Sequence, residues 1–120
     1  MKIRLRDNSV RFRLNQREVA ALASGSAVES RTDFPGGAVL LCRLTPGGEQ
    51  IVAELADSTI AVSMPAAAIA AWAAGEEIAI GGRHDSLRIS VEKDLECRHA
   101  RPGEDDSDAF PAPAASATQS

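Results

Sequence analysis

The chain has 120 residues, enough for one domain of ordinary size, and its 44% hydrophobic content is sufficient for a packed core. Aromatic residues make up only 3% of it, so stacking platforms for single-stranded nucleic acid are not expected and nucleic acid is an unlikely partner. No apolar run approaches the ~18 residues that span a membrane, and the N-terminus lacks the continuous apolar segment of a secretory signal. We therefore expect a cytoplasmic protein without a membrane partner, whose Cys42 and Cys97 remain thiols.

The net charge of −4 is unevenly distributed along the sequence. Residues 1–17 contain six lysines and arginines against Asp7 alone, whereas residues 92–108 contain seven carboxylates against three lysines and arginines. Such asymmetry indicates either an external anionic partner or an internal pairing of the two ends. The composition leaves both alternatives open.

The first part of the chain has the pattern of a hairpin followed by a helix. Residues 2–6 and 10–14 alternate apolar and charged side chains, which predicts two half-buried strands joined by a tight turn. Asn15 and Glu18 have capping-box spacing and predict a helix that ends near Gly25. The expected elements that follow are a strand at 27–32, a loop at 34–37, an apolar strand at 38–44 and a turn at 46–48.

The second part repeats this order when the chain is offset by 50 residues. The expected elements are strands at 50–55 and 59–64, a helix between Pro65 and Gly75, a strand at 77–80, a loop at 81–85 and a strand at 87–91. We therefore predict one α+β domain over residues 1–92, with half-units at about 1–45 and 49–92. About eight mainly antiparallel strands and two short helices would form a curved sheet or small barrel. Whether a ββαββ unit was duplicated stays open, because few residues are identical.

A charged segment follows the domain. Residues 93–111 contain Pro102 and Gly103, and we expect this segment to dock on the domain. Residues 112–120 are of low complexity, so we expect them to be disordered.

The two ends carry the most distinctive motifs, KIRLRDNSVRFRL at 2–14 and EKDLECRH at 92–99 followed by EDDSDAFP at 104–111. With them the chain resembles a family of small bacterial proteins of unknown function. Members of that family open with a KIR–NSxRxRL strand pair and close with an EKD–C–H–EDE–FP segment. The chain departs from this pattern at Leu95, where Phe is expected, and at Ala112, where Asn is expected. The resemblance covers nearly the whole ordered chain and implies no activity.

The closing segment contains a weak metal-site pattern. Cys97 and His99 are zinc-type ligands, and the carboxylates that follow them are Glu104, Asp105, Asp106 and Asp108. A structural zinc site normally needs two ligand pairs, so the favoured interpretation is a small buried thiol beside a hydrogen-bonded histidine, with no cofactor. A nucleophile–base pair is disfavoured, because residues two apart on a strand lie ~6.6 Å apart.

Four arginines, Arg4, Arg6, Arg11 and Arg13, fall on the polar face of the first predicted hairpin. They would bind an anionic ligand, an acidic protein, or the chain's own Glu104, Asp105, Asp106 and Asp108, with Phe110 as an apolar plug. The sequence therefore favours a non-enzymatic binding module, and it leaves open the pairing of two copies through their sheet edges as a homodimer. The alternative is a metal-dependent or phosphate-handling enzyme using Cys97, His99 and the 104–108 carboxylates.

Overall fold

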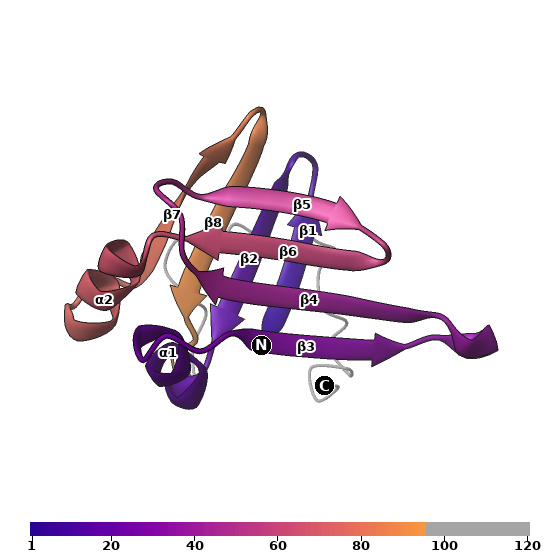
Figure 1. Cartoon of the computed structure of the whole chain (residues 1–120), viewed down its shortest axis with the longest axis horizontal. Coiled ribbons are helices and arrows are strands. Elements are labelled where there is room, and N and C mark those ends of the chain that lie inside the picture. Colours follow the sequence, from indigo (N-terminus) through magenta and orange to yellow (C-terminus); the bar gives the residue numbers. More distant parts are fainter. Residues whose placement is uncertain (96–120) are drawn as a thin grey trace, which may run out of the picture.

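The computed structural model describes residues 1–95, in which a strand–strand–helix–strand–strand order occurs twice (Figure 1). The first half contains β1 (Lys2–Arg6), β2 (Ser9–Leu14), α1 (Gln16–Ala23), β3 (Val28–Asp33), a 3₁₀ turn (Pro35–Gly37) and β4 (Val39–Pro46). The second contains β5 (Val52–Ala56), β6 (Thr59–Met64), α2 (Ala66–Ala74), β7 (Ala79–His84) and β8 (Leu87–Lys93). The α+β class with eight strands and two helices is confirmed.

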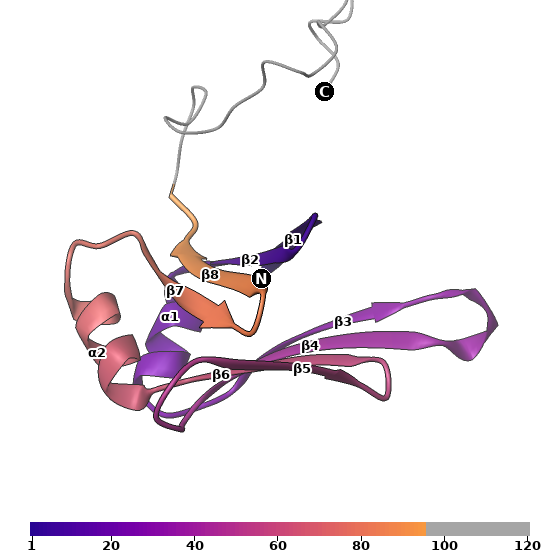
Figure 2. The same ribbon diagram turned by 90° about the horizontal axis from the view of Figure 1, so that it is seen from above.

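The strands divide into two four-stranded sheets. The first sheet has the order β1-β2-β8-β7 and the second has the order β3-β4-β6-β5. In each sheet the outer pairs are antiparallel and the central pair, β2–β8 or β4–β6, is parallel. Figure 2 shows the two sheets as separate layers with both helices at one end, so the described strands do not close into a barrel.

Each sheet is built from one hairpin of each half. The hairpin β1–β2 pairs with β7–β8 from the far end of the described chain, while β3–β4 pairs with β5–β6. An isolated hairpin is at best marginally stable in water. The two halves therefore stabilise each other. The central parallel pair of the first sheet, β2–β8, joins segments that are distant in the sequence, whereas that of the second sheet, β4–β6, joins segments that are close.

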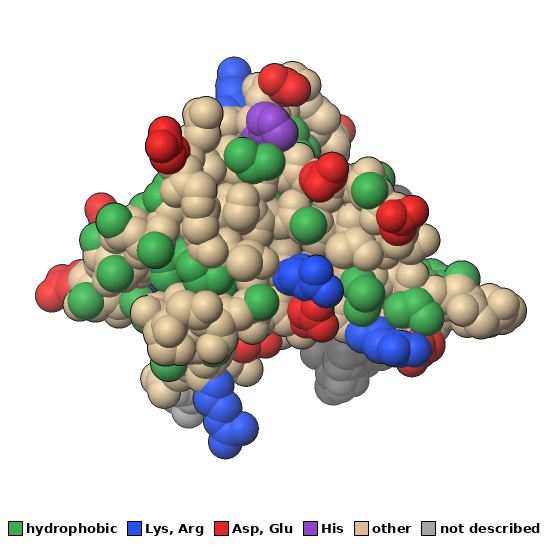
Figure 3. Space-filling view, in the orientation of Figure 1, with side chains coloured by type: hydrophobic (Ala, Val, Ile, Leu, Met, Phe, Trp, Pro, Cys, Tyr) green, Lys and Arg blue, Asp and Glu red, His purple; other side chains and the backbone are tan. Residues whose placement is uncertain are grey.

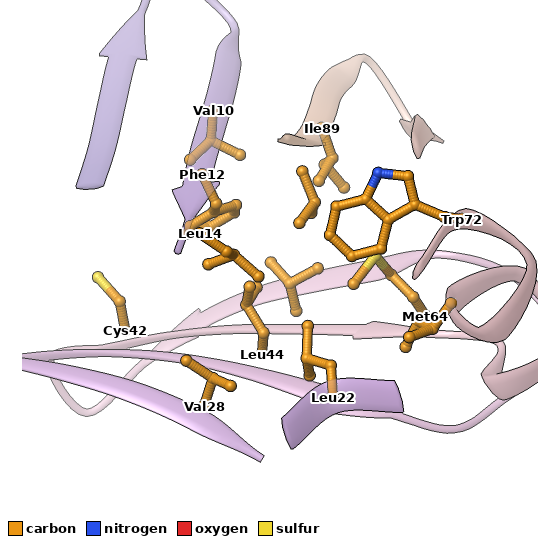
Figure 4. Packing of buried hydrophobic residues seen from close by; sticks show 13 residues of the cluster. Val10, Phe12, Leu14, Leu22, Val28, Cys42, Leu44, Met64, Trp72 and Ile89 are labelled. Carbon is orange, nitrogen blue, oxygen red and sulfur yellow. The ribbon is translucent and has the colours of Figure 1, made fainter. Parts of the chain in front are cut away.

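The core lies between the sheets and the helices (Figure 4). Alternate residues of β2, β4, β6 and β8 point into it, and Phe12, Leu44, Trp72 and Val91 are completely inaccessible to solvent. The indole Nε1–H of Trp72 donates to the carbonyl oxygen of Ile78 at 3.0 Å, so this buried polar atom is satisfied. Trp72 is the core anchor of α2.

The predicted capping box is confirmed at the start of α1. The Glu18 backbone N–H donates to Asn15 Oδ1 and the Asn15 backbone N–H donates to Glu18 Oε1, both at 2.9 Å. The amino group of Met1 lies 2.7 Å from Glu18 Oε2. The residue that precedes β1 is thereby held against α1.

The prediction of a loop at residues 81–85 was wrong, because β7 continues to His84 and only Asp85 and Ser86 form the turn. A glycine pair ordinarily indicates a loop. Here Gly81 lies so close to β8 that an added Cβ would overlap the carbonyl oxygen of Ile89. The glycine therefore permits close strand contact and does not break the strand.

Candidate anion-binding face

The outer face of the first sheet is an array of three rows, each crossing all four strands. The rows, read from β1 to β7, are Lys2–Arg13–Glu92–Ala79, Arg4–Arg11–Ser90–Gly81 and Arg6–Ser9–Arg88–Arg83. We call this surface the basic face; its cations are Lys2, Arg4, Arg6, Arg11, Arg13, Arg83 and Arg88. Within the array Glu92 is the one carboxylate.

Like charges lie directly opposite each other at three positions on the basic face. The antiparallel register places Lys2 opposite Arg13 and Arg4 opposite Arg11. It also places Arg83 opposite Arg88. Directly opposite residues have Cβ atoms about 5 Å apart, and like charges at this separation destabilise a sheet. The face therefore retains repulsion that a bound anion would relieve.

Glu92 organises the centre of the basic face. Its Oε2 lies 3.1 Å from Arg11 Nε and its Oε1 lies 3.4 Å from Arg13 Nε. The hydroxyl of Ser90 also donates to Glu92 Oε2 at 3.1 Å. At the edge of the array, Lys2 Nζ lies 3.1 Å from Asp94 Oδ2. One carboxylate thus fixes two guanidinium groups while neutralising only one of their charges.

Three arginines of the basic face have no carboxylate partner within residues 1–95. Arg4, Arg83 and Arg88 are exposed, and none of them forms an ion pair with a described residue. Side chains held in internal ion pairs are less available to a ligand. These three guanidinium groups therefore have the greatest capacity to bind an added anion.

A hollow of about 690 Å³ lies on this face over β2, β8 and β7. Its lining includes the small outward-facing residues Ser9, Ala79, Gly81 and Ser90. Arg11, Arg83 and Arg88 line it as well. The strand register thus places guanidinium groups beside Ser9, Gly81 and Ser90, while Ala79 lies opposite the carboxylate of Glu92.

The outer face of the second sheet provides an internal comparison, since it is built from the corresponding hairpins. There Arg31 Nε lies 3.0 Å from Asp33 Oδ1, and Arg43 pairs with Glu29. Figure 3 shows this side of the molecule, where basic and acidic side chains lie next to one another. The excess of positive charge is therefore specific to the first sheet, since the second sheet has the same architecture but pairs its arginines with carboxylates.

The structure brings together the four arginines that the sequence singled out. Arg4 and Arg6 lie on β1, and Arg11 and Arg13 lie beside them on β2. Arg83 and Arg88 were not predicted as members of this face. Arg88 could have been found, because the inward-facing residues of β8 alternate with it and so place it on the outer face. Arg83 fell in the predicted loop. Nothing local in the sequence indicated that β8 pairs with β2.

The remaining predicted site residues lie outside the described residues. These are Cys97, His99, Glu104, Asp105, Asp106, Asp108 and Phe110, together with the predicted tail segments after residue 95. Among residues 1–95, no three His, Cys, Asp or Glu side chains are grouped so as to hold a metal ion. Burial raises the pKa of the Cys42 thiol, which favours its unreactive protonated form.

No helix within residues 1–95 has the length and apolar character needed to cross a membrane.

The comparison with protein families gives one match. The model of a family whose function is unknown matches residues 1–114. No curated protein and no solved structure matches the chain significantly. The site must therefore be interpreted from its own geometry.

Proposed function

The chain belongs to the DUF7009 family of unknown function, and we propose that it is a non-enzymatic binding module whose basic face receives an acidic segment. The observation that carries this proposal is the set of three like-charge cross-strand pairs on one sheet, Lys2–Arg13, Arg4–Arg11 and Arg83–Arg88. The occupant is either the chain's own carboxylates at 104–108 or an anionic partner.

The spacing of the cations suits an extended acidic chain. Lys2, Arg4 and Arg6 occupy alternate positions of β1, so they repeat about every 6.6–6.8 Å along the strand. Alternate residues of an extended ligand repeat at the same interval. A ligand of this kind would neutralise several cations at once and would stabilise the folded state by mass action.

The chain's own acidic segment is within reach of the basic face. The described chain leaves β8 beside this face, where Asp94 pairs with Lys2 and its N–H donates to the carbonyl oxygen of Leu14. Eight residues separate Leu95 from Glu104, a length that reaches up to about 26 Å when extended. Crossing four strands takes only about 14 Å, so contact within one molecule is sterically feasible.

The test measures binding of poly-L-glutamate to the full-length chain at low ionic strength. One variant combines Arg4→Gln with Arg6→Gln on the basic face, and its matched control combines Arg31→Gln with Arg43→Gln on the second sheet. We expect the first variant to weaken binding about tenfold, because it removes charged hydrogen bonds, and the control to have little effect. Equal loss in both variants would contradict the proposal, as would a lack of binding both by the full-length chain and by the tail-neutralised variant described next.

A third full-length variant distinguishes the two occupants. It neutralises the acidic segment with the substitutions Glu104→Gln, Asp105→Asn, Asp106→Asn and Asp108→Asn. If the segment covers the face within the molecule, poly-L-glutamate affinity rises and the thermal midpoint falls. If a partner and not the segment occupies the face, the poly-L-glutamate affinity and the thermal midpoint stay unchanged. The variant with Arg4→Gln and Arg6→Gln still binds poly-L-glutamate more weakly.

Other predictions from the sequence stay proposals. The bacterial source stays a proposal from the resemblance that the motifs at the two ends of the chain carry, and the cytoplasmic location stays an untested prediction. The twofold occurrence of one element order and the equivalent strand orders of the two sheets support an ancestral duplication of a ββαββ unit. Homodimer formation and a metal-dependent enzyme using Cys97 and His99 also remain untested predictions.

A further inference from the structure

We infer that the hollow lined by Arg11, Arg83 and Arg88 is a site for a phosphoryl group carrying about two negative charges; this rests on the proposed anion-binding function. Arg83 and Arg88 lie opposite each other on β7 and β8. Arg11 lies on β2, two residues along the strand from Ser9, which is the partner of Arg88. The three guanidinium groups therefore approach the hollow from three different strands.

The floor of the hollow allows a ligand to approach the sheet. Ser9, Ala79, Gly81 and Ser90 are the smallest side chains on the basic face. Gly81 lies opposite Ser90, Ala79 lies two residues from Gly81 along β7, and Ser9 lies diagonally from Ser90 across β2 and β8. The hydroxyl of Ser9 donates to the carbonyl oxygen of Arg6 at 2.8 Å, and that of Ser90 donates to Glu92. Because both hydroxyl protons are already used, the donors to a ligand must be the guanidinium groups.

Hydrogen bonds between the two hairpin turns fix this end of the site. Asn8 Nδ2 donates to the carbonyl oxygen of Ser86 at 2.7 Å and to its Oγ at 2.9 Å. The backbone N–H of Arg88 donates to the carbonyl oxygen of Asn8 at 3.0 Å. These bonds hold β1–β2 against β7–β8, so the backbone positions of the arginines are set before a ligand arrives. Such preorganisation lowers the entropic cost of binding.

The local charge favours a phosphoryl group over a single carboxylate. Arg83 and Arg88 have no carboxylate partner within the described chain, and Arg11 shares Glu92 with Arg13. A carboxylate supplies one charge and two oxygens. A phosphate monoester supplies −1.5 to −2 charges near pH 7 and three acceptor oxygens, and arginine forks bind such oxygens in a bidentate manner. The two guanidinium groups of Arg83 and Arg88, with the shared guanidinium group of Arg11 beside them, match the larger anion.

The test measures the NMR chemical shifts of the backbone amides of the full-length chain during separate titrations with phenyl phosphate, benzoate and inorganic phosphate. The tail-neutralised chain is titrated in parallel, so that coverage by residues 104–108 cannot hide the site. We expect phenyl phosphate to shift the amides of Ser9, Gly81 and Ser90 and to bind at least tenfold more tightly than benzoate. Arg83→Gln and Arg88→Gln should each weaken its binding about tenfold, while Arg17→Gln on α1 serves as the matched control.

The possible outcomes distinguish a phosphoryl site from a general anion-binding face. Equal binding of phenyl and inorganic phosphate shows that the phosphoryl group alone is recognised, whereas tighter binding of phenyl phosphate shows that its ester substituent adds contacts; both support the site. Equal binding of benzoate and phenyl phosphate overturns the inference, as does an affinity unchanged by the Arg83 and Arg88 substitutions. If poly-L-glutamate binds the face but phenyl phosphate shifts nothing in either chain, the site fails while the proposed function stands. If neither ligand binds, both fail.

Discussion

Glu92 is the carboxylate that restrains the charge of the basic face, and its replacement by glutamine should affect stability and binding in opposite directions. The amide has nearly the same volume as the carboxylate and keeps an acceptor for Ser90. It removes the negative charge that lies 3.1 Å from Arg11 Nε and 3.4 Å from Arg13 Nε. We expect Glu92→Gln to destabilise the fold and to bind anions more tightly.

The magnitude follows from how far each ion pair is shielded from water. The side chains of Glu92 and Arg13 are only 18% and 14% exposed, so this pair resembles a charged hydrogen bond of about 1.5–3 kcal/mol. The Arg11 side chain is 40% exposed, which limits its contribution to about 0–1 kcal/mol. Allowing for the acceptor that glutamine retains, we expect a loss of about 2 kcal/mol. A ligand at 100 times its Kd would restore about 2.7 kcal/mol.

Urea unfolding monitored by fluorescence measures this loss, because Trp72 is the one tryptophan of the chain and is fully buried. The midpoint should fall by about 1 M with an unchanged slope, and poly-L-glutamate should restore it. The matched control is Glu29→Gln, since the Glu29–Arg43 pair lies on the second sheet with both side chains 45% exposed. A midpoint no lower than that of the control, or an unaltered anion affinity, would refute the reasoning.

Two further predictions concern the strands beneath the face and the core. Gly81→Ala should destabilise the fold by more than about 2 kcal/mol, because its Cβ would overlap the carbonyl oxygen of Ile89, whereas Gly82→Ala meets only a side-chain methyl group and should cost less in the same urea assay. Because burial raises the pKa of Cys42, the unfolded thiol ionises first as pH rises, so stability should fall above about pH 8.5 by up to 1.4 kcal/mol per pH unit. Urea midpoints from pH 7 to 10 in a Cys97→Ser background check this slope, and Cys42→Ala should remove it; a slope that persists in that variant would show another cause.

Much of the secondary structure was predictable because its signals are local. The period-two alternation of residues 10–14 follows from a strand with one buried face, and it placed Arg11 and Arg13 on the outer surface. The Asn15–Glu18 capping box marked the start of α1 for an equally local reason. Where a local signal had two physical meanings, the prediction failed: the glycines at 81 and 82 indicated a loop, but they allow close strand contact.

The sequence by itself determined the first four arginines of the basic face, since each lies at an outward position of one hairpin. Only the tertiary structure decided that the hairpin at the other end of the described chain completes the same sheet and adds Arg83 and Arg88. The physical reason is that the β2–β8 pairing joins residues about 79 positions apart. Strand alternation specifies which side chains face outward, but the choice of partner strand and its register depend on packing of the whole core. That long-range pairing, and not a sequence motif, creates the hollow.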